Sequence, residues 1–458
     1  MFNLFKSRLP TGRTTVECAP TCRQSSSSSP LPCGRLILIH AIQYLSCLVI
    51  LLPSFCRAET LEQLISTALL EHPTVQVQEA QRQAAEAGLD SAAWQFYPTP
   101  SIAIEKVQTS ASDPSYRGDS TAATLRLQQP LWTGGRLSAG LKKAEAGVMT
   151  SQASLEEVRQ QLALRVVQAY GDWLTAHLRS QAYDKSMATH VHLRELVKRR
   201  VEQGISAEND LTLVVSRLES IVADIALVHA QKDTALARLG QLLGRRVETP
   251  ALNAAIAAPR PVNADLQALL DQALSVNPTI QKAQAQALAQ EAAISERRAD
   301  LSPEVYVRAE RQYGNQTYSN APTENRVFLG VSSHFGAGLS SLSAIESAKA
   351  QHQAALEEVV AQSRTVNEQV MADYALATSS ERRLTALKTA LKAAEEVSRS
   401  YDRQFLAGRR TWQDTMNSVR ELVQIEVQMA DTVATQLLSS WRLSIYTQGL
   451  EAVVKEVS

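Results

Sequence analysis

Apolar residues recur every three or four positions in two long stretches of the chain, one from residue 155 and one over 356–377. This spacing places the apolar side chains in one stripe along an amphipathic helix. No proline lies between Pro130 and Pro250, so a helix over 136–202 could run unbroken for about 100 Å. The pattern therefore predicts long helices that pack as coiled-coil hairpins. The first stripe contains Leu155, Val158, Leu162, Val166, Ala169, Trp173 and Ala176.

The two halves of the chain repeat each other. LEQLISTALLEHPTV at 61–75 aligns with LQALLDQALSVNPTI at 266–280, an offset of 205 positions, and Pro98 matches Pro303 at the same offset. A repeat of this length is a duplicated module and not a short-period solenoid. Each repeat is expected to contain a helix, a β-hairpin and a long helical hairpin. The predicted parts are a first repeat at 59–248 (β-hairpin about 101–130, helical hairpin 136–246), a linker at 249–265 and a second repeat at 266–458 (β-hairpin about 304–334, helical hairpin 338–450).

Between the helices, apolar and polar residues alternate, as in strands with one apolar and one polar face. Ile102 and Ile104 alternate with Ala103 and Glu105, and the same period recurs in three further segments. Four strands cannot close a barrel, which needs about eight. Any membrane-spanning barrel would therefore have to be assembled from several chains. The polar face, which suits a water-filled lumen, would carry Glu105, Arg126, Gln128 and Arg308.

The N-terminus has the pattern of a secretory signal peptide at 1–58. An apolar run at 36–52 follows five basic residues, and Cys56-Arg57-Ala58 provides small residues around a cleavage site after Ala58. A retained membrane anchor is the alternative, but the run is short. All five cysteines lie in this segment, so the exported chain would be cysteine-free and mildly acidic. With 46 basic and 46 acidic residues overall, the composition argues against nucleic-acid binding.

The exported sequence carries no pattern that indicates catalysis, a cofactor or a metal. Its histidines are scattered, and His190 and His192 would point to different helix faces. GQLLGRR at 240–246 lacks the length and the Lys-Ser/Thr of a phosphate loop, and a helix C-terminus explains it more simply. Trp132 is a candidate for a membrane interface, whereas Trp173 and Trp441 are more typical of a core.

The duplicated helix, hairpin and long-helix plan resembles the TolC family of outer-membrane channels over essentially the whole exported chain. The matching residues are His72-Pro73, Asn277-Pro278, QPLWTGGR at 129–136, EQGISAENDL at 202–211 and LAGRRTWQDTMN at 406–417. The resemblance implies a mainly α protein that forms a homotrimer. Its twelve-stranded β-barrel would lie in the lipid of the cell outer membrane, and its α-helical tunnel in the periplasm. A periplasmic adaptor and an inner-membrane transporter would dock at the far end.

The GRRTWQD sequence in the second turn is most similar to the branch of the family that serves type I secretion of large adhesins. The expected function is thus a type I secretion channel that passes a secreted protein. The alternatives are the outer-membrane component of a multidrug efflux pump and a periplasmic coiled-coil adaptor. An enzyme on a helical scaffold is disfavoured because no catalytic constellation is present.

The two helical turns supply the candidate functional residues. Gly204 and Gly408 can adopt the left-handed conformation that ends a helix. Ser206 and Thr411 are expected to cap the following helices, and Thr411 with Asp414 has the spacing of a capping box. These residues could simply be good turn formers. The resemblance implies that adaptor helices also contact the turns, at Gly204, Ile205, Ser206, Gly408, Arg409, Thr411 and Trp412; for Trp412 ordinary packing is an equally good explanation.

The resemblance also implies a gate at this end, in which Arg410 bonds Asp210 and holds the entrance closed. Phe405 occupies the position of an aromatic residue in the closed network, but it lacks the hydroxyl of the usual tyrosine. Asp414 matches an aspartate that faces the lumen. Its usual acidic companion is replaced by Asn417, which weakens the expectation of cation block.

Overall fold

The computed structural model describes residues 60–108, 114–249, 252, 257–262, 265–320, 322–333, 337 and 340–455. The contacts within the chain divide it into residues 1–57 and 58–458, and all described residues belong to the second unit. The predicted signal peptide and its cysteines lie outside the described residues. Among the described residues, no helix combines the length and the apolar character needed to cross a membrane.

Each repeat opens with two helices joined at a proline. These are α2 (Leu61–Glu71) and α3 (Pro73–Trp94) in the first repeat, and α7 (Leu266–Val276) and α8 (Pro278–Ala299) in the second. His72 and Asn277 end one helix and cap the next, each accepting a hydrogen bond from the backbone N–H two residues on. The proline follows at the first helical position, where no N–H is needed. The HP and NP elements are therefore helix-to-helix corners.

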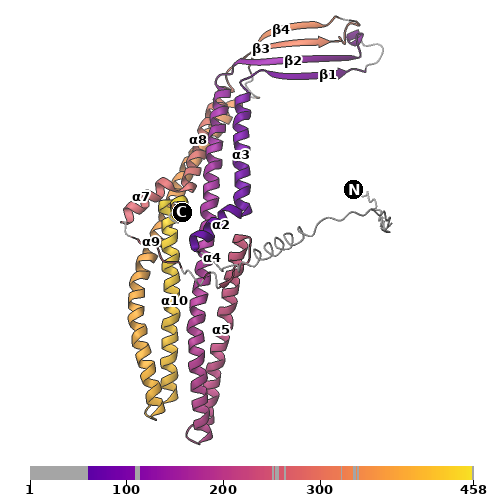
Figure 1. Ribbon diagram of the computed structural model, residues 1–458. Helices are drawn as coiled ribbons and strands as arrows, with labels where there is room; N and C mark the ends of the chain where they lie inside the picture. The colour runs from indigo at the N-terminus through magenta and orange to yellow at the C-terminus, as the bar shows by residue number, and fades with distance from the viewer. Residues whose placement is uncertain are drawn as a thin grey trace, which may run out of the picture. The chain divides into compact units, whose positions relative to one another are not determined.

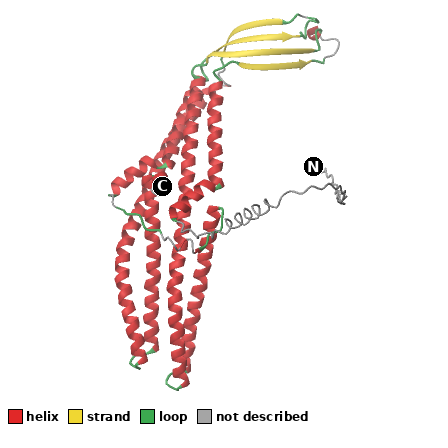
Figure 2. Ribbon diagram, in the orientation of Figure 1, coloured by secondary structure: helices red, strands yellow, loops and turns green. Residues whose placement is uncertain are grey.

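Two very long helical hairpins form most of the described chain (Figures 1 and 2). The first consists of α4 (Arg136–Glu202) and α5 (Glu208–Leu243), the second of α9 (Ser340–Leu406) and α10 (Trp412–Gln448). Helix α4 has the 67 residues of the predicted helix over 136–202, and α9 has the same length. The helices α5, α4, α10 and α9 lie side by side in that order, because α4 contacts both α5 and α10. A short helix, α11 (Leu450–Lys455), follows.

The four strands form a single antiparallel sheet in the order β1-β2-β3-β4. Their bounds are β1 (Thr99–Lys106), β2 (Thr121–Trp132), β3 (Glu304–Tyr313) and β4 (Glu324–Ser332). The two predicted hairpins are thus joined through the pairing of β2 with β3, which brings the two repeats together. The sheet continues from α3, α4 and α8 at one end of the helices, and the hairpin turns lie at the other end (Figure 1).

The main hydrophobic core lies midway along α4. Trp173 and Tyr170 are fully buried there, together with Leu61 of α2, Leu239 of α5 and Trp441 of α10. The linker is held against this core, since the Trp441 indole N–H donates to the carbonyl of Ala258 at 3.0 Å. Trp173 and Trp441 are therefore core residues, as their sequence context indicates.

Candidate functional site: the paired hairpin turns

The two hairpin turns have the same backbone geometry. Gly204 and Gly408 have φ angles of 72° and 71°, in the left-handed region that was predicted for them. The N–H of Ile205 donates to the carbonyl of Arg200 at 2.8 Å, and the N–H of Arg409 donates to the carbonyl of Gln404 at 2.8 Å. These bonds satisfy carbonyls that the ends of α4 and α9 would leave free.

The turns differ in how they start the next helix. Thr411 caps α10 as predicted: its hydroxyl accepts from the N–H of Asp414 at 3.2 Å, and the Asp414 carboxylate accepts from the Thr411 N–H. Ser206 does not cap α5, so that prediction is wrong. The N-cap is Ala207, which has no side chain that could accept a hydrogen bond, because α5 begins at Glu208. Helix α5 therefore lacks the side-chain N-cap that α10 has.

Arg410 and Asp210 are not bonded to each other within one chain. The Arg410 guanidinium lies 4.5 Å from the centre of the Tyr401 ring, donates to Gln404 at 3.3 Å and lies 3.7 Å from the Asp414 carboxylate. Asp210 accepts from the side-chain amide of Gln413 at 3.4 Å, which links the two turns. An Arg410–Asp210 bond stays a prediction for contacts between subunits.

Phe405 is buried in a second hydrophobic cluster, which we call the tip cluster. Only 2% of Phe405 is exposed, and the Arg200 guanidinium lies 4.5 Å from the centre of its ring. The cluster takes residues from α4, α5, α9 and α10 and so joins both hairpins near their turns. Its buried members are Leu193, Val197, Val214, Phe405, Trp412 and Met416.

The remaining turn residues divide by exposure. Ile205 is 65% exposed, and Arg409 is also exposed, so both are available to a partner. Trp412 is only 5% exposed and packs in the tip cluster. In this conformation its ring is not available to an adaptor, and the packing explanation fits it instead.

The opposite end of the molecule has a sheet with two chemically distinct faces. The face with Ile102, Ile104, Val327 and Leu329 is open, and these four side chains are 71–76% exposed. On the other face, the Arg126 guanidinium lies 2.7 Å from the Glu310 carboxylate, across the β2–β3 pair. Exposed apolar surface of this kind marks an interaction with lipid or another protein.

A family model described as "Outer membrane efflux protein" matches residues 64–245 and 269–444, which together make up more than half of the chain. The chain belongs to the outer membrane efflux protein family. The two matched segments are the two repeats. Members of this family are channels and not enzymes, and they lie in the outer membrane with a helical tunnel in the periplasm.

Solved structures share the fold. Residues covering 85% of this chain superpose on 96% of VceC, an outer-membrane protein of Vibrio cholerae, with a TM-score of 0.72 and 16% identity. The Campylobacter jejuni channel CmeC gives a TM-score of 0.72 and 14% identity, covering 85% of both chains. The open Neisseria gonorrhoeae channel MtrE gives 0.70 and 16% identity, covering 85% of this chain and 89% of MtrE. No curated protein matches the sequence. The resemblance to TolC-like channels is confirmed, and the type I branch is not distinguished from the rest.

Three residues of this efflux-family turn region were missed from the sequence: Arg200, Tyr401 and Gln413. Tyr401 lies one helical turn before Phe405, so the helical period of the aromatic positions could have indicated it. Arg200 donates a hydrogen bond to Phe405, and Gln413 donates one to Asp210. Each of these bonds joins one repeat to the other. No local pattern could have shown these contacts.

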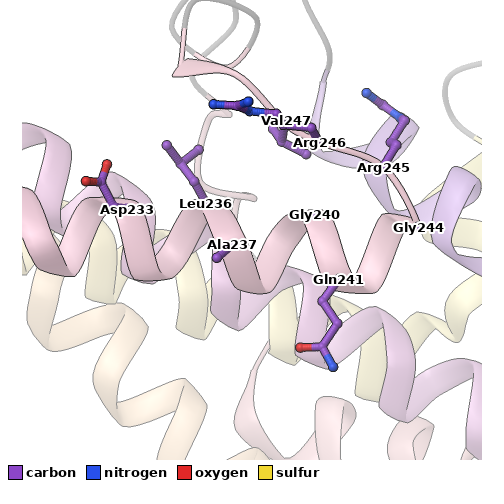
Figure 3. Close-up of a pocket in the computed structure, with 9 residues that line it drawn as sticks. All are labelled: Asp233, Leu236, Ala237, Gly240, Gln241, Gly244, Arg245, Arg246 and Val247. Atoms are coloured by element: carbon purple, nitrogen blue, oxygen red, sulfur yellow. The ribbon is translucent and has the colours of Figure 1, made fainter.

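The GQLLGRR segment is a helix C-terminus, as the sequence suggested. Gly244 ends α5 with a φ of 67°, and the N–H of Arg245 donates to the carbonyl of Gly240. An open pocket of about 790 Å³ lies beside it (Figure 3). A helix C-terminus presents carbonyl oxygens, which repel phosphate. Among the described residues, no group of three His, Cys, Asp or Glu side chains converges on a metal position.

His190 and His192 lie on different faces of α4, as predicted. His190 is 4% exposed, and its Nδ1 lies 2.9 Å from the carbonyl oxygen of Ser186. Burial lowers the pKa of the His190 imidazole and outweighs the opposite effect of the hydrogen bond with the Ser186 backbone. The groove around His190 also contains Arg217, Asp224 and Arg420. Burial therefore favours the neutral form of this imidazole in the folded protein.

We expect acidification to destabilise the protein through His190. With its pKa lowered on folding, the neutral ring contributes stability in full above the unfolded value of about 6.5, and this contribution declines as pH falls toward the folded pKa. Thermal unfolding of His190→Gln should depend less on pH between 7.5 and 5.5 than that of the wild type. His192→Gln, at an exposed position, is the matched control, and an unchanged pH dependence in His190→Gln would contradict the prediction.

Proposed function

We propose that three copies of this chain form a channel-tunnel, the outer-membrane exit of an export system that spans the cell envelope. The observation that carries the proposal is the incomplete sheet: four strands with free edges at β1 and β4 and an exposed apolar face. Backbone groups in a bilayer need partners, so an open four-stranded sheet cannot lie in lipid alone. Three copies would supply twelve strands, with the apolar face toward lipid and the ion-paired face toward a water-filled lumen.

The helical part supports the same assembly. Toward the turns, α5 and α9 are the two outer helices of the row α5, α4, α10, α9, since α5 packs on α4 and α9 packs on α10; the half of α9 nearer the sheet also packs on α8. Apolar side chains on these helices are 40–59% exposed. Head-to-tail contact of α5 with α9 of the next copy would cover such residues and close a ring. Toward the turns, the exposed residues include Val222 and Leu227 on α5, and Leu376 and Val397 on α9.

The partners follow from the position of the turns. The turns lie at the end of the molecule farthest from the sheet, where exposed Ile205 and Arg409 would meet a periplasmic adaptor and, through it, an inner-membrane transporter. We propose a secreted protein as cargo, as in type I secretion. This proposal about the cargo rests on the GRRTWQD sequence in the second turn. Small-molecule efflux is the second candidate, supported by the family match.

The assembly is tested by fractionating cells that express the full chain and running the outer-membrane fraction on gels without heating. We expect heat-sensitive trimer bands, and purified trimers should conduct ions in planar lipid bilayers. A stably folded monomer that conducts by itself would overturn the proposal. The cargo is tested by deleting the gene: loss of a large protein from the medium supports type I secretion, and increased sensitivity to toxic compounds supports efflux instead.

A gate formed by Arg410 and Asp210 predicts the behaviour of two variants. In Arg410→Ala and in Asp210→Ala, single-channel conductance should rise, because each change removes one side of a contact between subunits. An exposed pair contributes about 0–1 kcal/mol, and threefold repetition in the ring multiplies this effect. Trimers should still assemble. If conductance is unchanged in both variants, the gate does not consist of this pair.

A further inference from the structure

Arg200 connects the two hairpin turns of one chain. Its backbone carbonyl accepts hydrogen bonds from Ile205 and Ser206, at 2.8 and 3.2 Å, and so shapes the first turn. Its guanidinium extends to the second hairpin, where it lies over the Phe405 ring and donates to the Phe405 carbonyl at 3.4 Å. One residue therefore contributes to the first turn through its backbone and holds the second through its side chain.

The surroundings of Arg200 make this contact specific. Arg200 is half-buried, and no carboxylate within the described part of the chain forms an ion pair with it. A guanidinium over an aromatic face is most favourable when it is partly removed from water. Beneath it, Phe405 and Trp412 from the second hairpin pack against Leu193 and Val197 from the first. Separating the hairpins would expose this whole cluster.

The duplicated halves differ at this position. Gln404 occupies the place of Arg200 in the second repeat, since its carbonyl accepts from Arg409 in the same way. Its side chain stays within its own turn and accepts from Arg410 at 3.3 Å. The guanidinium contact between the two hairpins is thus made from the first hairpin only, by an arginine that has no counterpart in the second.

We propose that Arg200 is a positioning residue of the tunnel entrance, which holds the second hairpin tip against the first within each subunit. Contact with the ring face and carbonyl of Phe405 provides the attachment that a phenylalanine, without a hydroxyl, cannot provide by hydrogen bonding from its side chain. Loss of the contact releases the second hairpin tip and widens the entrance. The inference rests on the proposed channel function, and it is independent of the Arg410–Asp210 gate.

The test uses the full chain, which has no cysteine beyond residue 58. Met416→Cys places a single thiol in the tip cluster, where Met416 is 5% exposed. In trimers that also carry Arg200→Ala, we expect maleimide labelling of this thiol to accelerate by roughly three- to tenfold, the range that a partly desolvated cation–π contact implies. Single-channel conductance should rise in parallel. Arg199→Ala, which removes the same charge from an exposed neighbour, should leave both measurements unchanged.

Phe405→Leu is the second variant, because it keeps an apolar side chain and removes the ring face. It should reproduce most of the Arg200→Ala effect, and the double variant should add little to Arg200→Ala, since both changes remove the contact of the guanidinium with the ring. Equal labelling and conductance in Arg200→Ala and Arg199→Ala would overturn the inference. Wild-type protein that forms no conducting trimer would instead refute the proposed function, while the labelling rates would still report on the contact.

Discussion

Replacing Ile102 with arginine is expected to prevent insertion of the protein into the outer membrane. Ile102 lies in β1 on the open apolar face of the sheet, with 73% of its surface exposed. Arginine on the lipid face of a membrane strand costs about 2–4 kcal/mol near the middle of the bilayer, and a trimer incurs this cost three times. We expect the trimer band to disappear from outer-membrane fractions, as measured on unheated gels.

The adjacent residue provides a matched control. Ala103 is also exposed, in the same strand and at the same depth, but its side chain points to the opposite, polar face. An arginine at position 103 would face the water-filled lumen, so Ala103→Arg should insert normally. Equal insertion of both variants would show that the apolar face does not contact lipid, and it would remove the main support for the channel proposal.

Replacing Trp173 with alanine is expected to cause the largest loss of stability from a single core substitution. Trp173 is fully buried midway along α4, with the Tyr170 ring 5.3 Å away and the His177 ring stacked at 5.2 Å. Truncating a buried tryptophan leaves a cavity and costs about 3–5 kcal/mol. Thermal unfolding of detergent-solubilised protein, followed by circular dichroism, should show a clearly lower midpoint.

Two further variants show whether burial is the cause. Trp94→Ala removes an equally large ring that is 68% exposed at the end of α3, and it should change stability by no more than about 0.5 kcal/mol in detergent. Trp173→Phe fills part of the cavity and should lose less stability than Trp173→Ala. A Trp173→Ala protein as stable as Trp94→Ala would mean that the core described around α4 does not support the folded state.

Much of the fold could be predicted because its signals are local and repeated. Proline-free apolar stripes predicted α4 with its observed bounds, and period-two alternation located all four strands. The offset between LEQLISTALLEHPTV and LQALLDQALSVNPTI predicted the duplication, which the two matched segments of the efflux family confirm. These features depend on residues close in sequence, so the chain itself displays them.

The turns were predicted in part. Gly204 and Gly408 were identified because a left-handed residue at a helix end favours glycine, and the Thr411–Asp414 box was identified from its spacing. Ser206 was wrongly assigned as a cap because helix α5 starts one position later than expected, and serine and alanine at neighbouring positions gave no indication of where it would start.

By itself, the sequence determined that this protein is a duplicated helical and strand-containing chain with special turns, because periodicity, proline positions and glycine preferences act over a few residues. Only the tertiary structure decided that β2 pairs with β3, that Arg200 reaches Phe405 and that Gln413 reaches Asp210. Each of these contacts joins residues about one repeat apart. Their formation depends on how the two repeats pack on each other, a property that no local pattern encodes.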